Sequence, residues 1–91
     1  MFFVYDLKKS ESNKTKHGID FLEGQALWKD PDALYDIPDT FRNGEQYWLI
    51  VGATLGLLWA GIYTKRGRTT RIISIRRARD YERVEYENLK N

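Results

Sequence analysis

The chain has 91 residues, of which 42% are hydrophobic, and this size fits one compact domain over residues 1–91 with a modest core. Its formal net charge of +2 hides an asymmetry, because nine acids accompany six bases up to Glu45 and four acids accompany nine bases after it. The absence of cysteine excludes disulfides, thiolate nucleophiles and zinc–sulfur sites, and we expect a cytoplasmic protein because the opening residues carry no secretory signal.

The N-terminal half predicts one short strand and two helices with capping residues. Asp6 can cap the first helix because its carboxylate accepts free backbone N–H groups, and Gly18 can end it in the left-handed conformation. Asp20 followed three residues later by Glu23 resembles a capping box at the start of the second helix. The predicted elements are a strand over Phe2 to Tyr5 and helices over Leu7 to His17 and Phe21 to Lys29.

The middle of the chain predicts an edge strand, a loop and a hairpin. Pro38 to Gly44 is rich in turn-forming residues and predicts a polar, mobile loop. Gly52 and Gly56 predict a five-residue turn between two buried strands. The predicted strands are Ala33 to Ile37, Tyr47 to Val51 and Leu57 to Thr64.

That five-residue turn sets a register for the hairpin, with Leu49 opposite Trp59. In this register one face is aliphatic, and the other carries Tyr47, Leu49, Trp59 and Tyr63. Aromatic side chains with polar ends are typical of a sheet face that meets a partner. We therefore predict that the interface with a protein partner includes Tyr47, Trp59 and Tyr63.

A membrane helix is the alternative interpretation of the same segment. No charged residue occurs from Gln46 to Thr64, and Gly52 and Gly56 have the spacing that packs membrane helices. Glycines weaken a helix, however, and the aromatic and β-branched residues suit a pleated surface. We therefore favour the hairpin and expect no membrane association.

The C-terminal part predicts a turn, a strand and a helix. Lys65 to Arg68 is turn-like, Thr69 to Arg77 predicts a strand, and a helix should follow from about Ala78 to Leu89. The order is then β-α-α-β-β-β-β-α. This order predicts an α+β fold with a mainly antiparallel sheet, two N-terminal helices and a C-terminal helix.

Seven of the eight arginines fall between Arg66 and Arg83. No acid occurs from Lys65 through Arg79, and unpaired bases that close together repel one another unless an external anion binds them. Arginine presents a planar fork of donors that suits phosphate, so the cluster favours a nucleic acid. We expect RNA contacts from Arg68, Arg76, Arg79 and Arg83.

Strand alternation should divide these arginines between the two faces of the sheet. It predicts Arg71 and Arg77 on one face and Arg76 on the other. Arg79 and Arg83 start the terminal helix and can pair in part with its glutamates.

His17 is the one histidine and stands beside Lys16 at the end of the first predicted helix. One interpretation is a capping residue that interacts favourably with the helix dipole. The other is a general acid or base at a phosphodiester, since imidazole titrates near neutrality. The acids between Asp30 and Asp39 lack a metal-loop pattern, so we expect neither a metal nor another cofactor.

A set of short motifs runs in order along almost the whole chain. Its N-terminal pieces are Asp6, Lys9, Asn13 and Lys16-His17-Gly18, and its C-terminal pieces are Tyr63-Thr64-Lys65-Arg66-Gly67, Arg71-Ile72-Ile73-Ser74-Ile75-Arg76-Arg77-Ala78 and Glu82-Arg83. In this order and spacing the chain resembles the BrnT family, the ribonuclease toxins of type II toxin–antitoxin modules, whose fold is similar to RelE-type toxins.

The resemblance implies a metal-independent endoribonuclease that inhibits translation until an antitoxin similar to BrnA covers it. It also implies that this antitoxin has a ribbon-helix-helix part, that the two proteins form a complex, expected to be a heterotetramer, and that operator DNA is bound only through the antitoxin. Carried over to matching positions, the candidate catalytic residues are Lys16, His17, Arg66, Arg71 and Arg77.

The residues also suggest how such an enzyme would work. If the 2′-hydroxyl of the RNA is the nucleophile, the protein needs a base, an acid and fixed cations, but no metal or nucleophilic side chain. We assign proton transfer or its electrostatic support to Lys16 and His17, and phosphate binding to Arg66, Arg71 and Arg77. The alternative is a non-enzymatic nucleic-acid-binding module in which the cluster from Arg66 to Arg83 only positions phosphates.

Overall fold

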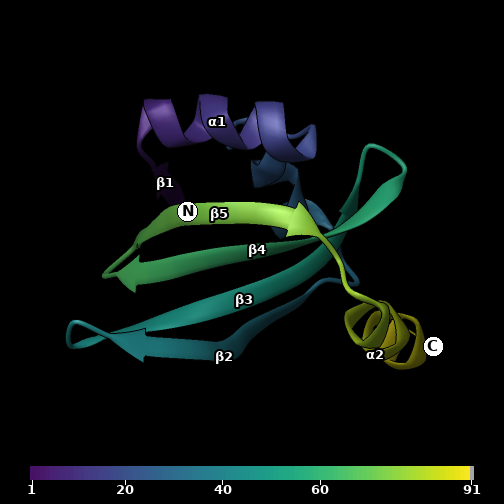
Figure 1. Cartoon of the computed structure of the whole chain (residues 1–91). Coiled ribbons are helices and arrows are strands. Elements are labelled where there is room, and N and C mark those ends of the chain that lie inside the picture. The colour runs from purple at the N-terminus through teal and green to yellow at the C-terminus, as the bar shows by residue number, and fades with distance from the viewer. Residues whose placement is uncertain (91) are drawn as a thin grey trace.

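The computed structural model describes residues 1–90, which form a five-stranded sheet with a helix on either side (Figure 1). The order of the strands across the sheet is β1-β5-β4-β3-β2. The elements are β1 (Phe2–Val4), α1 (Leu7–His17), η1 (Glu23–Lys29), β2 (Leu34–Arg42), β3 (Glu45–Thr54), β4 (Leu57–Arg66), β5 (Thr69–Arg77) and α2 (Asp80–Lys90). The predicted α+β class is confirmed, and the predicted order of elements is confirmed in part, because the second helix is a 3-10 helix.

The sheet is mixed, because β1 runs parallel to β5 while the other three neighbouring pairs are antiparallel. The capping box is present as predicted: the Glu23 N–H donates to Asp20 Oδ1 at 2.7 Å and the Asp20 N–H donates to Glu23 Oε1 at 3.0 Å. It opens η1, a 3-10 helix, rather than the predicted α-helix. The predicted caps of α1 are confirmed, with Asp6 accepting from the Lys9 N–H and Gly18 at φ 84°.

Two tight turns make the hairpins longer than predicted. Asn43-Gly44 joins β2 to β3 with φ of 52° and 73°, and Leu55-Gly56 joins β3 to β4 with φ of 54° and 73°. Positive φ at both positions matches the two-residue turns that suit the twist of a hairpin. The predicted mobile loop from Pro38 is wrong, because β2 continues to Arg42. As an edge strand, β2 tolerates a proline that cannot donate a hydrogen bond.

The register between β3 and β4 differs from the predicted one by an odd number of residues. Leu49 pairs with Ile62 instead of Trp59, which pairs with Gly52. An odd shift exchanges the faces of one strand relative to the other. Ile50, Trp59 and Tyr63 therefore share one side of the sheet, and the predicted aromatic face is wrong.

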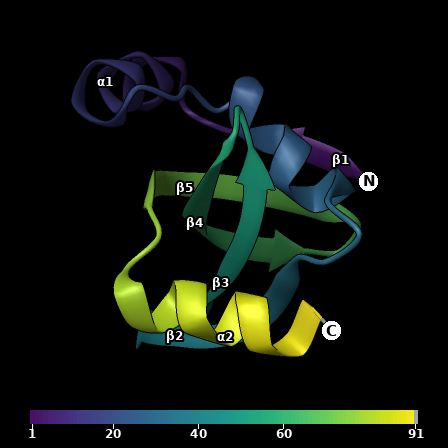
Figure 2. The same ribbon diagram turned by 90° about the vertical axis from the view of Figure 1, so that its right-hand side faces the viewer.

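Two hydrophobic clusters cover the two sides of the sheet, and Figure 2 shows α1 and α2 on opposite sides. We call these sides the α1 face and the α2 face. The cluster on the α1 face contains Leu27 of η1, and the cluster on the α2 face includes Tyr86 of α2. The α1-face cluster is Ile19, Phe21, Leu27, Ile50, Trp59, Tyr63, Ile72 and Ile75, and the α2-face cluster is Leu49, Val51, Ala60, Ala78 and Tyr86.

Polar contacts fasten α2 at two points, one on β5 and one on the segment between η1 and β2. Arg76 donates to both oxygens of Glu82 at 2.8 and 2.9 Å, and the Tyr86 hydroxyl donates to Asp30 Oδ2 at 2.8 Å. Burial alone would raise the pKa of the Glu82 carboxyl, but the hydrogen bonds from Arg76 and the Arg79 N–H outweigh it and lower the pKa. Burial likewise opposes the hydrogen bonds that lower the pKa of the Asp30 carboxyl.

These lowered pKa values predict that the protein loses stability in acid. A carboxyl whose folded pKa is depressed stabilises the fold above its unfolded pKa, about 4, and that contribution is lost as the pH falls through the folded value. We expect the free energy of unfolding, from urea denaturation, to be nearly constant between about pH 7 and 5 and to fall below about pH 4. Tyr86→Phe should make this decrease in the free energy of unfolding smaller, because Asp30 then loses the hydroxyl donor that helps to lower its pKa. Equal stability at pH 7 and pH 3 would contradict the prediction.

Within residues 1–90, no helix is long and apolar enough to cross a membrane. The uncharged segment that permits the membrane interpretation forms most of β3 and β4.

Candidate nucleic-acid interface and active site

The arginines of β5 are divided between the two faces of the sheet by a bulge. Ser74 pairs with Ile62 and Ile72 pairs with Tyr63, so Ile73 is an extra residue on β5. The extra residue places Arg71 on the α2 face, while Arg77 lies on the α1 face with its guanidinium 5.6 Å from the centre of the Trp59 ring. The prediction that Arg71 and Arg77 share a face is therefore wrong.

Several arginines of the cluster are paired with acids that lie far away in the sequence or in the terminal helix. Arg76 binds Glu82, and Arg83 binds Asp80 one turn away on α2. The Glu82 partner is buried and Arg76 itself is partly buried, so this pair holds α2 in place and leaves Arg76 less free for RNA. Arg79 is exposed, and its backbone N–H, which donates to Glu82 at 2.7 Å, helps to start α2.

One end of the α2 face collects basic side chains around a single carboxylate. The Nε and Nη2 atoms of Arg66 lie 3.1 and 3.3 Å from the two oxygens of Glu45, and Arg42 lies over the Tyr47 ring at 4.8 Å. Figure 1 shows that α2 lies near the other end of the sheet, away from the β2–β3 turn. We call this group the basic end, and its members are Arg42, Glu45, Tyr47, Arg66 and Arg71.

The geometry of the strands explains why these residues meet. Arg42 pairs directly with Glu45 across the β2–β3 turn, and Glu45 and Tyr47 alternate onto the same face of β3. Arg71 pairs with Thr64, two residues before Arg66 on β4, and so faces the same side.

Electrostatics keep the carboxylate of the basic end ionised at neutral pH. The hydrogen bond from Arg66 lowers the pKa of Glu45; desolvation opposes it, and the charges of Arg66 and Arg71 lower the pKa further. Glu45 is therefore present in the form that accepts a proton, beside cations that attract phosphate.

A buried hydroxyl lies beneath this surface. Thr64 is 0% exposed, and its Oγ1 has no hydrogen-bond partner among the described residues. It follows Tyr63 on β4 and so points to the α2 face, between the strands that carry Tyr47 and Arg71.

Lys16 and His17 lie elsewhere, at the exposed end of α1 next to the edge of β5. They line a shallow pocket of about 170 Å³ together with Lys9, Ser12, Asn13, Ile73 and Ser74. No arginine lines this pocket. In the structure, Lys16 and His17 therefore lie at a different site from Arg66 and Arg71.

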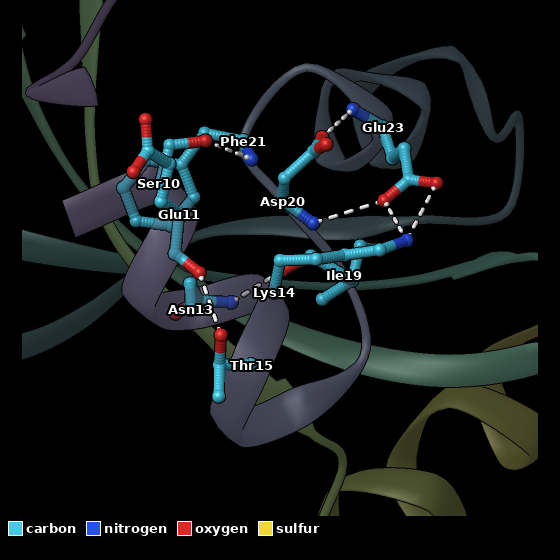
Figure 3. Close-up of polar contacts among 9 residues, drawn as sticks. All are labelled: Ser10, Glu11, Asn13, Lys14, Thr15, Ile19, Asp20, Phe21 and Glu23. Carbon is cyan, nitrogen blue, oxygen red and sulfur yellow. Dashed lines mark hydrogen bonds and ion pairs between the residues drawn. The ribbon is translucent and has the colours of Figure 1, made fainter. Parts of the chain in front are cut away.

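Buried polar residues of α1 hold this pocket in place. The Asn13 amide nitrogen donates to the carbonyls of Ile19 and Ile75, each at 2.8 Å, and Asn13 Oδ1 accepts from the Ile75 N–H at 3.1 Å. Figure 3 shows Asn13 and Ser10 on α1, with Ser10 Oγ accepting from the Phe21 N–H at 2.9 Å. Because α1 has no apolar stripe, these hydrogen bonds hold it against the sheet instead. They also fix the positions of Lys16 and His17 relative to β5.

The aromatic residues predicted for a partner interface are not all accessible. Trp59 and Tyr63 are 2% and 1% exposed, respectively, in the α1-face cluster. The Tyr63 hydroxyl donates to Asp36 Oδ1 at 2.6 Å and accepts from the Asp36 N–H at 2.7 Å. Only Tyr47 is partly exposed, and it belongs to the basic end.

The remaining candidates are exposed cations away from the basic end's centre. Arg68 lies in the turn between β4 and β5, and Arg77 lies on the α1 face. Within residues 1–90, no three side chains of metal-binding type lie close enough to share an ion.

Sequence reasoning missed Glu45 as the acid of the site and Arg42 as a member of it. Glu45 directly follows a predicted loop, and Arg42 is the one arginine outside the cluster from Arg66 to Arg83. The available signal was Asn43-Gly44, because a two-residue turn places the residues on either side of it directly opposite each other.

The fold and the basic end define a small α+β domain with a basic patch on one sheet face and an ionised carboxylate at its centre. Residues 5–82 match the family of the ribonuclease toxin BrnT of type II toxin–antitoxin systems, and the chain belongs to this family. A search among curated proteins finds no match.

Proposed function

We propose that this ribonuclease toxin is a metal-independent endoribonuclease that acts in the cytoplasm and inhibits translation by cutting RNA. The observation that supports this function best is the pair of Glu45 and Arg66 beside Arg71 on the open end of the α2 face. This arrangement supplies a base and two phosphate-binding cations from side chains alone, without a cofactor.

In the proposed reaction the Glu45 carboxylate takes the proton of the RNA 2′-hydroxyl. The 2′-oxygen then bonds to phosphorus, the bond to the 5′-oxygen breaks, and that oxygen receives a proton. Arg66 and Arg71 stabilise the charge that builds on the phosphoryl oxygens. Tyr47, on the same face two residues from Glu45, is our candidate for the group that protonates the leaving oxygen. The products carry a 2′,3′-cyclic phosphate and a 5′-hydroxyl.

The other sequence-predicted residues are assigned to RNA binding beyond the cleaved bond. Arg68 extends the basic end at the β4–β5 turn, and Arg77 with Lys16 and His17 lies on the other side of β5. Proton transfer by Lys16 and His17 is the rival assignment that the family resemblance implies. We favour Glu45 because no arginine lines the His17 pocket, so a phosphate there would lack bidentate donors.

An assay of RNA cleavage in the presence of a chelator distinguishes this function from that of a module that only binds RNA. We expect the purified chain to cut single-stranded RNA in EDTA at an undiminished rate and to leave 2′,3′-cyclic phosphate ends, detected by mass spectrometry. A matched oligonucleotide with 2′-deoxyribose at every position should bind but remain intact. A shift in mobility with no product from RNA would favour the binding module.

For the partner, we propose an antitoxin similar to BrnA, with a ribbon-helix-helix part that binds operator DNA and brings two toxin chains into a heterotetramer. The mass of the purified complex, from light scattering, tests this stoichiometry. A complex with one copy of each chain would contradict it.

A further inference from the structure

An apolar groove separates α2 from the β2–β3 edge of the sheet. Its volume is about 680 Å³. The floor is formed by strand residues and one wall by α2, and its main apolar lining residues are Leu34, Ile37, Leu49, Val51, Tyr81 and Leu89.

The large side chains on the rim of this groove are open to solvent. Tyr35, Tyr81 and Leu89 are 61%, 62% and 65% exposed, respectively. On a domain this small, apolar side chains gathered around an open groove are typical of a surface that binds another molecule.

The groove continues into the basic end along a single strand. Val51 and Leu49 at the floor of the groove and Tyr47 and Glu45 at the basic end alternate on the same face of β3. From Val51 to Glu45 the strand rises about 20 Å, a length that a helix of about 13 residues spans.

The surface charge changes from negative at the groove to positive at the basic end, and this change indicates which kind of molecule binds there. Glu85 lines the groove, whereas the basic end carries Arg42, Arg66 and Arg71 around one carboxylate. A nucleic acid would suit the basic end but not the apolar groove. A protein segment suits both if it is apolar over the groove and acidic over the arginines.

We propose that one continuous segment of the antitoxin, apolar at one end and acidic at the other, fills the groove and crosses the basic end. This inference rests on the proposed function for the identity of the partner. The acidic end then occupies the positions of the RNA phosphates, so binding and inhibition are the same event. Tyr47 lies at the junction and contacts the segment.

The test compares two glutamate substitutions on α2 that differ in their position relative to the groove. Leu89→Glu puts a charge at the groove, and Val84→Glu puts the same charge on an exposed position of the same helix outside it. The probe is the antitoxin that neutralises the parent chain when the two are co-expressed. We expect its dissociation constant, from titration calorimetry, to rise about 30-fold or more with Leu89→Glu and less than about 3-fold with Val84→Glu.

Tyr35→Glu, on the opposite rim, gives an independent check and should weaken binding as Leu89→Glu does. All three variants should cut RNA at the parent rate when the antitoxin is absent. This measurement separates the groove from the proposed activity, because binding is measured whether or not the chain cleaves RNA.

Three results would overturn the inference. Both groove variants could bind the antitoxin as tightly as Val84→Glu does. Leu89→Glu could weaken RNA binding instead, which would make the groove part of the substrate site. The chain alone could sediment as a dimer that Leu89→Glu dissociates, which would assign the groove to a second copy of the chain.

Discussion

Replacing Glu45 with Gln should lower the rate of RNA cleavage by about 100-fold or more, because glutamine keeps the shape of the side chain but cannot accept the 2′-proton. Arg66 loses its ionic partner and is free to bind phosphate, so affinity for RNA should not fall. The rate is measured with a fluorescent RNA oligonucleotide, and the affinity with its 2′-deoxy analogue by fluorescence anisotropy.

Glu23→Gln is the matched control for this substitution. Glu23 is likewise a partly exposed carboxylate in an ion pair, with Lys14 Nζ at 2.8 Å, but it lies at the start of η1 (Figure 3). Glutamine also serves in a capping box, so this variant should fold and cut RNA at nearly the parent rate.

His17→Ala decides between the two assignments of the base. With Glu45 as the base, His17→Ala should lower the cleavage rate by about 10-fold at most, through weaker RNA binding. If His17→Ala instead abolishes cleavage while Glu45→Gln leaves it intact, the reaction takes place at the α1 pocket, and our assignment is wrong.

The largest loss of stability should come from replacing Asn13, as in Asn13→Ala. Alanine leaves the N–H and carbonyl of Ile75 and the carbonyl of Ile19 without their partner in a buried place. At about 1 kcal/mol for each bond, we expect the free energy of unfolding to fall by about 3 kcal/mol. Thermal unfolding, followed by circular dichroism, should shift down by roughly 10–20 °C.

The neighbouring residue provides the comparison. Ser12 is exposed on the same helix, and Ser12→Ala should change the free energy of unfolding by no more than about 0.5 kcal/mol. Asn13→Asp should destabilise the fold at least as much as Asn13→Ala, because its carboxylate would be buried against the carbonyl oxygens of Ile19 and Ile75. Equal stability of Asn13→Ala and Ser12→Ala would show that the bonds to β5 contribute little.

Elements marked by local chemistry could be predicted from the sequence. The bounds of α1 follow from Asp6 and Gly18, and those of β5 from a turn glycine followed by a run of β-branched residues. The capping box of Asp20 and Glu23 also involves residues only three positions apart. Such signals depend on neighbours in the chain, so one sequence is enough to interpret them.

The parts that depend on distant residues could not be predicted in the same way. The pair of Arg66 and Glu45 joins two strands whose register is set by the two-residue turn Leu55-Gly56, and a different assumed turn put Trp59 on the wrong face. Likewise, the acid that binds Arg76 comes from α2, six residues later, and reaches it only because α2 folds back on the sheet.

The extra residue Ile73 means that the spacing of the arginines matters as much as their identity. Arg71 and Arg76 are five positions apart, yet they share a face because the bulge uses one position without changing sides. A chain that lost one residue here could keep every arginine and every strand while turning Arg71 away from Glu45. Deleting Ile73 should therefore separate Arg71 from Glu45, so in this chain the number of residues between Arg71 and Arg76 matters to the basic end as much as the arginines themselves.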